Sequence, residues 1–428
     1  MSAVRVPDGC TVTDVLDALR HLVERHDSLH SLYLEQAGVE LQRVLDRGEL
    51  EVDLYPLADG DALAQGQALG AVLRRELFDP ATDLPLRAAV LTAGDQPRAI
   101  VLTACHMAVD GWSFQIVLQD LRRLLDEPTG ATLMPPAQQP VARAAYEQTP
   151  AARRREERAL TFWEQNIRTL PSAMLSEVVT NEPVPLRWAQ IESRAMALAI
   201  ASLSAQARVS SSVTFLAAIT MLLALHTSEQ SAAVRVIVAT RFKTENERLV
   251  GAFNQNALFR MDLADESIGD FLRRAASSAA SAYRSSEYNP RSLESMVQRV
   301  ATERGIEAGG YCYVNDVRYE LYGEADAEAP ADVAAEIRDA MPGSVLVDLE
   351  DTRIQKGSKF FIYLRGGPQR SIVQLSAHPH FLAPNSPADF LSDLEWMLTT
   401  AACDNPSIGE LRKQWSQRHP GRPGCDSD

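Results

Sequence analysis

The feature that most constrains the fold is a pair of apolar runs followed at once by an amphipathic stretch. The runs 85–91 and 98–105 flank Thr92-Ala93-Gly94-Asp95-Gln96-Pro97, and this arrangement predicts a β-hairpin that ends near Cys105. Beyond it, apolar residues recur at helical spacing from Phe114 to Leu125 and predict a helix. A hairpin joined directly to a helix indicates that strands and helices are mixed in this part of the chain.

The same mixture continues along all 428 residues, a length that suggests two or three domains. A capping box, Thr11-x-x-Asp14, opens a helix near the start, and Ser386-Pro387 has the form of an N-cap followed by proline. Further helices are predicted at 151–166, 212–226 and 386–400. Further strands are predicted at 39–45, 51–55, 233–240, 311–317, 345–349, 359–365 and 371–378.

Composition excludes several classes of protein. Hydrophobic residues make up 46% and charged residues 23%, which is typical of a globular chain and excludes a disordered or fibrous one. The net charge of −15 repels phosphate backbones and argues against a nucleic-acid partner. The longest apolar run, Val213 to Leu225, is shorter than the ~20 residues of a membrane span and predicts a buried core helix. The first residues lack the apolar core of a signal peptide, so a cytoplasmic protein without membrane contact is expected.

Cysteines and histidines give no pattern of a disulfide frame or a metal site. The five cysteines show no C-x-x-C spacing, which indicates reduced thiols; they are Cys10, Cys105, Cys312, Cys403 and Cys425. His26-x-x-x-His30 lacks the glutamate of an H-E-x-x-H motif, and His378-Pro379-His380 has no visible third ligand. No resident metal is therefore expected.

The segment with the clearest chemical potential runs from Cys105 to Ser113. It places His106 at the end of a buried strand and follows it with Asp110-Gly111 and a helix. A histidine held there can take a proton near neutral pH, and the glycine lets the backbone bend and leaves a bare N–H nearby. The pattern is short, however, and taken alone it fits a core histidine beside an ordinary Asp-Gly turn better than a catalytic one.

The context changes that interpretation. The segment resembles the H-H-x-x-x-D-G signature of nonribosomal peptide synthetase condensation domains, including the Trp-Ser that often follows it. Further segments resemble the motifs of that family in the same order, from about residue 11 to residue 400; they are Leu19 to Leu29, Phe162-Trp163, Val250 to Arg260, Tyr283 to Pro290 and Tyr313 to Asp316.

Three features depart from the family pattern. Cys105 stands where the first histidine of the pair is usual, whereas His106 keeps the second, on which the family relies. Gln255 replaces the usual asparagine of the V-G-x-F-x-N segment, and the opening A-Q-x-R-x-W motif is absent. No adenylation, carrier or thioesterase segment is visible, so the resemblance implies a stand-alone condensation enzyme that acts on carriers supplied in trans.

For the fold, the resemblance implies an α/β protein with two chloramphenicol-acetyltransferase-like lobes. We expect an N-terminal lobe over residues 1–170 and a C-terminal lobe over residues 171–428. The lobes would form a V, with an active-site tunnel between them and His106 at its floor. We also expect a monomer.

For the site, the resemblance implies that His106 is catalytic and that Asp110 is structural, in a salt bridge with Arg241 of the other lobe. A solvated strand-end charge remains an equal alternative for Arg241. The other implied site residues are a backbone oxyanion donor, a channel asparagine and three tunnel residues; they are Gly111, Asn315, Cys105, Trp112 and Ser113. Simple turn geometry also explains Gly111, and a turn or strand-end position also explains Asn315.

The implied reaction joins an acyl or peptidyl thioester to an amine or alcohol acceptor and forms an amide or an ester, with chain release as one form. The donor would arrive on the phosphopantetheine of a carrier protein, the acceptor would be a small molecule or a second carrier, and the enzyme would need no cofactor of its own. The densest basic patch, around Arg153, Arg154, Arg155 and Arg158, fits either an acidic carrier or a solvated helix face.

Two other functions remain open. A coenzyme A-dependent acyltransferase of the same superfamily is disfavoured by the absence of a D-F-G-W-G segment. A non-catalytic relative that only recruits a partner is disfavoured because His106 and Asp110-Gly111 are present.

Overall fold

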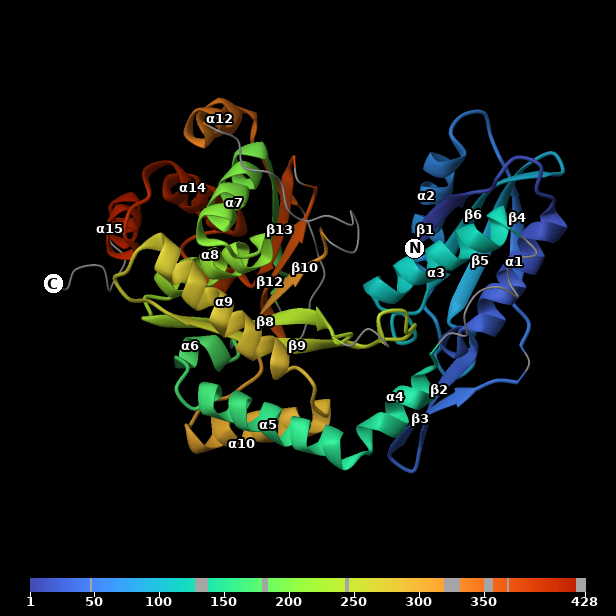
Figure 1. Cartoon of the computed structure of the whole chain (residues 1–428), viewed down its shortest axis with the longest axis horizontal. Helices are drawn as coiled ribbons and strands as arrows, with labels where there is room; N and C mark the ends of the chain where they lie inside the picture. Colours follow the sequence, from blue (N-terminus) through green and yellow to red (C-terminus); the bar gives the residue numbers. More distant parts are fainter. Residues whose placement is uncertain are drawn as a thin grey trace. The chain divides into compact units, whose positions relative to one another are not determined.

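The chain folds into two compact units (Figure 1). The structure, a computed structural model, describes residues 1–46, 48–127, 138–178, 184–242, 246–318, 332–349, 357–367 and 369–420. Unit 1 comprises Met1–Thr149 and Ala239–Asn254, and unit 2 comprises Pro150–Val238 and Gln255–Asp428. Unit 1 contains the segment around His106. These units differ from the predicted lobes, 1–170 and 171–428, in two places. Residues 150–170 pack with unit 2, and residues 239–254 pack with unit 1.

Unit 1 is built on a four-stranded sheet with strand order β1-β6-β5-β4. Its elements are β1 (Ser2–Arg5), α1 (Val12–Arg25), η1 (Asp27–His30), β2 (Ser31–Gln36), β3 (Val39–Val44), β4 (Val52–Pro56), α2 (Ala62–Leu73), β5 (Leu86–Ala93), β6 (Gln96–Ala104), α3 (Gly111–Asp126) and α4 (Pro140–Glu147). β4 runs parallel to β5, whereas β1 and β5 run antiparallel to β6. β2 and β3 form a separate antiparallel pair.

The predicted hairpin and helix are confirmed. β5 and β6 pair antiparallel through Leu86↔Ala104 to Ala93↔Gln96, and Gly94 takes a positive φ of 61° in the turn, where glycine pays no steric cost. α3 follows β6 and packs against α1. The buried apolar residues of these elements, such as Leu19, Ile100 and Leu121, form the core of unit 1.

Unit 2 is built on a seven-stranded sheet with strand order β11-β7-β13-β12-β10-β8-β9. Its elements are α5 (Pro150–Ile167), α6 (Ser172–Leu175), β7 (Arg187–Ser193), α7 (Arg194–Ala207), α8 (Ser211–His226), β8 (Ser231–Ala239), β9 (Asn254–Asp262), α9 (Ile268–Arg284), α10 (Pro290–Glu303), β10 (Tyr311–Asp316), α12 (Val333–Ala340), η4 (Met341–Gly343), β11 (Val345–Leu349), β12 (Ser358–Arg365), β13 (Ser371–Ala377), α13 (Pro379–Leu382), α14 (Pro387–Asp404) and α15 (Ile408–Arg418). β10 runs parallel to β8 and β12, and β13 runs antiparallel to β12 and β7.

The core of unit 2 lies between its sheet and the helices α7, α8 and α14 (Figure 1). A second, smaller cluster lies where α5 and α10 pack against β8 and β10. The apolar run Val213 to Leu225 is buried within α8, which confirms that it forms a core helix. Among the described helices, none is by itself long and apolar enough to cross a membrane. Among the described helices, α7 and α8 taken together are long and apolar enough for a span, but the chain bends by 106° between them.

A buried carboxylate ties α1 to α3 in unit 1. The Asp120 side chain, on α3, has no exposed surface; its Oδ2 lies 3.0 Å from Arg25 Nε and 3.0 Å from His26 Nε2, and its Oδ1 accepts a hydrogen bond from Arg248. Burial alone would raise the pKa of Asp120, but His26, Arg248 and Arg25 outweigh it and hold the pKa below its ordinary value. Arg25 and His26 belong to the R-H-x-x-L end of the predicted first helix, so this cluster gives that motif a structural role.

We expect Asp120→Asn to lower the free energy of unfolding by about 1–3 kcal/mol at neutral pH, because it removes the carboxylate that Arg25 and Arg248 bind and leaves a buried polar group with fewer hydrogen bonds. The lowered pKa makes this contribution complete above about pH 4 and removes it as the pH falls further, so the gap to the wild type should close in acid. Urea unfolding across pH measures both effects. Asp17→Asn, which removes an exposed carboxylate of α1, is the control and should cost about 0.5 kcal/mol or less. Equal stability of the two variants would contradict the assignment.

Candidate active site

His106 lies in a tight turn between β6 and α3. The turn is closed by hydrogen bonds from the N–H groups of Ala108 and Val109 to the Cys105 carbonyl, at 3.0 and 3.1 Å. The His106 side chain is exposed, and its Nδ1 lies 3.0 Å from the Val109 carbonyl oxygen. A carbonyl only accepts, so Nδ1 carries a proton and the neutral ring keeps the lone pair on Nε2. No described residue bonds to Nε2. The ring is therefore held in the form that can accept a proton from a bound molecule.

Asp110 points into the interior only four residues after His106. It is the N-cap of α3, where its Oδ1 accepts a hydrogen bond of 2.8 Å from the Ser113 N–H, and it is 3% exposed. Its two oxygens also accept from Arg241, with Nη1 at 2.9 Å and Nη2 at 3.0 Å, and from the Phe253 N–H at 2.9 Å. The carboxylate thus accepts four hydrogen bonds, which satisfies its lone pairs.

Arg241 is the partner that the sequence suggested for Asp110. The residue is 7% exposed, and its guanidinium also donates to the carbonyls of Leu249 and Gly251 at 3.1 and 3.2 Å. Its burial excludes the alternative of a solvated strand-end charge. By contact, Arg241 belongs to unit 1, because the segment 239–254 returns to the start of α3.

The V-G-x-F segment closes this network. The Val250 side chain belongs to the unit 1 core, and its carbonyl accepts a 2.7 Å hydrogen bond from the Ser28 hydroxyl. Gly251 exchanges two hydrogen bonds with the Ser113 hydroxyl, at 2.8 and 3.0 Å. A Cβ at Gly251 would lie 2.1 Å from the Phe253 ring, so a larger residue would require that ring to move. The resemblance identified this segment, but nothing in the spacing of the sequence indicated that it binds Asp110.

The other predicted site residues differ in their surroundings. Gly111 is the first residue of α3, where the backbone N–H has no partner within the helix. Trp112 is half-buried and donates from Nε1 to the Glu247 carbonyl at 2.9 Å, and Cys105 is a half-buried free thiol. Ser113 is fully buried in the Asp110 network rather than open to a channel. A tunnel position for Cys105 and Trp112 stays a prediction.

Asn315 lies in unit 2, on β10. It is half-buried, stands opposite Tyr363 of β12 in the sheet register and shares a face with Tyr313 by strand alternation. The structure therefore brings together the residues from Cys105 to Ser113 with Arg241, all within unit 1. The roles of Asn315, of the V-shaped arrangement and of the tunnel stay predictions.

Two other histidines singled out in the sequence have structural roles. His26 bonds to Asp120, and His378 caps the short helix α13 by accepting the His380 N–H. In the described part of the chain, no group of three histidine, cysteine, aspartate or glutamate side chains could hold a metal ion. Cys10, Cys105, Cys312 and Cys403 are free thiols, and Cys425 lies outside the described residues.

We expect Asp110→Ala to lower the free energy of unfolding by about 3–5 kcal/mol, because it leaves the Arg241 guanidinium buried and unpaired. Asp126→Ala, which removes an exposed carboxylate from the other end of α3, should change it by about 0.5 kcal/mol or less. A double variant, Asp110→Ala with Arg241→Met, should recover part of the loss, since no unpaired charge remains. Denaturant unfolding of the wild type and the three variants tests this. An Asp110→Ala protein as stable as the wild type would refute a stabilising ion pair.

Comparisons with known proteins place these features in a family. The family model of the condensation domain matches residues 2–306. The chain is 29% identical, over 283 residues, to CymA of Salinispora arenicola, described as a probable non-canonical nonribosomal peptide synthetase; the match covers 62% of this chain and 4% of that protein. The chain thus spans a small part of the curated relative that it matches.

Two solved structures share the fold. SgcC5 from Streptomyces globisporus gives a TM-score of 0.68 at 19% identity, over 94% of this chain and 92% of that one. The domain that mediates chain release from the enacyloxin polyketide synthase gives 0.68 at 18% identity, over 94% and 77%. These likenesses confirm the predicted α/β class with two chloramphenicol-acetyltransferase-like lobes. With a family model matched over residues 2–306 and the His106–Asp110–Gly111 geometry in place, the chain belongs to the condensation domains of nonribosomal peptide synthetases, a family that catalyses amide-bond formation.

Proposed function

We propose that this protein transfers an acyl or peptidyl group from a carrier-bound thioester to an amine or alcohol acceptor, with His106 as the catalytic residue. The observation that carries the proposal is the His106 ring, which is exposed and oriented by the Val109 carbonyl with Nε2 left to accept a proton. The reaction class follows from membership of the condensation-domain family.

The acceptor nitrogen or oxygen attacks the thioester carbon and passes its proton to His106 Nε2. The tetrahedral intermediate then collapses, the carbon–sulfur bond breaks, and the imidazolium returns the proton to the departing thiolate. An α-amine, with a pKa near 8, is partly neutral at pH 7 and needs His106 mainly for orientation and late proton removal. An alcohol has a weaker lone pair and needs a true general base.

The oxyanion of the intermediate needs a donor that is already in place. The N–H of Gly111 suits this task because it opens α3, where the helix dipole favours negative charge. Asn315 would contribute a polar contact from unit 2. Asp110 and Arg241 would act as positioning residues, since their network fixes the start of α3 without facing the substrate.

The donor would be presented on the phosphopantetheine of a carrier protein, and the enzyme would carry no cofactor of its own. Arg153, Arg154 and Arg158 are exposed on α5, whereas Arg155 is half-buried and pairs with Glu287 at 3.3 Å. Three exposed cations on one helix favour contact with an acidic carrier at short range, although the net charge of −15 opposes it at long range.

The acceptor would be a free amine or alcohol, or a second carrier. The similar enacyloxin domain mediates chain release, which supports transfer to a free acceptor as one form of the reaction. The intact Asp110–Arg241 network and the oriented His106 disfavour a non-catalytic role. A monomer working in the cytoplasm completes the proposal.

Replacing His106 tests the catalytic assignment. His106→Ala should leave the fold intact, because the side chain is exposed, and lower turnover by about 10²- to 10⁴-fold if His106 acts as general base. His380→Ala removes an exposed histidine of unit 2 and should leave turnover unchanged. Intact-mass measurement of an acylated carrier with a panel of amines and alcohols provides the assay. Wild-type turnover by His106→Ala would overturn the proposal.

The identity of the donor carrier is tested with one acyl group on three supports: a carrier protein, free pantetheine and coenzyme A. We expect the highest kcat/KM with the carrier protein. Arg153→Glu with Arg154→Glu should lower kcat/KM for the carrier about 10-fold or more and leave the pantetheine reaction unchanged. Arg74→Glu with Arg75→Glu makes the same charge change at an exposed site of unit 1 and is the control. Equal or better use of acyl-coenzyme A would favour a coenzyme A-dependent acyltransferase instead.

A further inference from the structure

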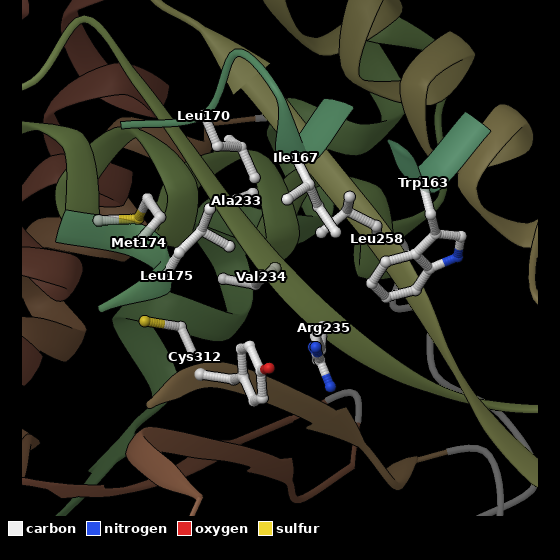
Figure 2. A pocket seen from close by; sticks show the side chains of 11 residues that line it. Trp163, Ile167, Leu170, Met174, Leu175, Ala233, Val234, Arg235, Leu258 and Cys312 are labelled. Carbon is white, nitrogen blue, oxygen red and sulfur yellow. The ribbon is translucent and has the colours of Figure 1, made fainter. Parts of the chain in front are cut away.

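A small cavity lies inside unit 2, where α5 and the α6 region pack against β8, β9 and β10 (Figure 2). Its volume is about 20 Å³, which exceeds the ~10–15 Å³ that one water-sized particle needs. Most of its lining is apolar, for example Leu170, Ala233 and Leu258. Arg235, from β8, is the charged residue of this lining.

The guanidinium of Arg235 lacks a counter-charge in the described part of the chain. Four arginines there are buried, and three of them pair with a carboxylate: Arg143 with Glu147, Arg241 with Asp110, and Arg318 with Asp316. Arg235 is 8% exposed, and its recorded side-chain hydrogen bond is with the neutral Tyr311 hydroxyl, which supplies no negative charge. A buried cation with five N–H donors is costly to leave in this state.

Two aromatic rings stabilise the charge of Arg235 without neutralising it. The guanidinium carbon lies 3.3 Å from the centre of the Tyr311 ring and 5.4 Å from that of Trp163, so both rings make cation–π contacts. The ring faces leave the N–H groups at the guanidinium edge unused. The Tyr311 hydroxyl is likewise buried; its oxygen lies close enough to Arg235 to accept a hydrogen bond from it, and its own O–H has no acceptor among the described residues. The Tyr311 O–H and the other guanidinium N–H groups thus lack an acceptor beside one cavity.

The neighbouring thiol does not supply the missing charge. Cys312 lines the cavity, and burial raises the pKa of its thiol to about 11, so the group is neutral at physiological pH. The site therefore combines a fixed positive charge, unused donors and a mostly apolar wall.

We propose that this cavity binds a chloride ion between Arg235 and the Tyr311 hydroxyl. A monovalent, single-atom anion meets three requirements at once: it fits the volume, neutralises the guanidinium and accepts hydrogen bonds from both donors. The site uses none of the residues assigned to the proposed reaction, and the bound ion would stabilise unit 2 rather than take part in catalysis.

Thermal unfolding in sodium chloride and in sodium gluconate at equal ionic strength tests the binding, because gluconate is too large for the cavity. An ion that binds only the folded state raises the melting temperature, and we expect chloride to raise Tm by about 2 °C or more over gluconate. In Arg235→Met the two salts should give the same Tm, whereas in Arg153→Met, an exposed control on α5, the difference should persist. Equal Tm values of the wild type in both salts would overturn the proposal.

A second measurement does not depend on any variant folding well. Crystals of the wild-type protein grown with bromide in place of chloride should show an anomalous peak within contact distance of the Arg235 guanidinium. An ordered water at that position, without anomalous signal, would mean that the donors are satisfied by water and would reject the chloride site.

Discussion

The ion pair between Asp110 and Arg241 is the interaction on which the geometry around His106 depends. Removing two charges from water costs several kcal/mol for each ion, and a pair repays this only when its remaining hydrogen-bonding groups are satisfied. Asp110 meets that condition with four hydrogen bonds, and the Arg241 guanidinium donates to two carbonyls as well. The result is a rigid junction between the start of α3 and the segment 239–254.

That junction separates two tasks within one short turn. Since the Cys105 carbonyl accepts from Ala108 and Val109, the chain reverses between His106 and Asp110. The imidazole is left exposed while the carboxylate is buried. Asp120, farther along α3, binds Arg248 of the same returning segment, so that segment is attached at two points to one helix and its N-cap. Asp110 thus stabilises the turn, while His106, four residues earlier, stays available for chemistry.

Local patterns in the sequence predicted the elements that depend on local information. The β5–β6 hairpin, the helices α3 and α8 and the caps at Thr11 and Ser386 are confirmed, because turn residues, apolar spacing and N-cap chemistry act over a few residues. Other elements were not predicted. β1 is four residues long and is defined by its pairing with β6, and α7 is apolar on nearly all sides and so shows no helical period.

The site residues also fall into those that the sequence predicted and those that only the fold shows. The position of His106 at the end of a strand could be predicted from the sequence, and the resemblance to condensation domains suggested the partner of Asp110. The hydrogen bond from Phe253 to Asp110 spans 143 residues, and no spacing rule reaches that far. Only the fold shows that the V-G-x-F segment needs its glycine because the Phe253 ring occupies the space of a Cβ.

The path of the chain through the two units has a consequence for how the protein is made. The first 149 residues contain nearly all of unit 1, but they lack Arg241, Arg248 and Val250, which fill or neutralise its interior. During synthesis these residues emerge only after α5, α7 and α8 of unit 2. Unit 1 therefore cannot complete its packing when its first 149 residues have left the ribosome. Asp110 and Asp120 gain their arginine partners only after the segment 239–254 is made, about a hundred residues later.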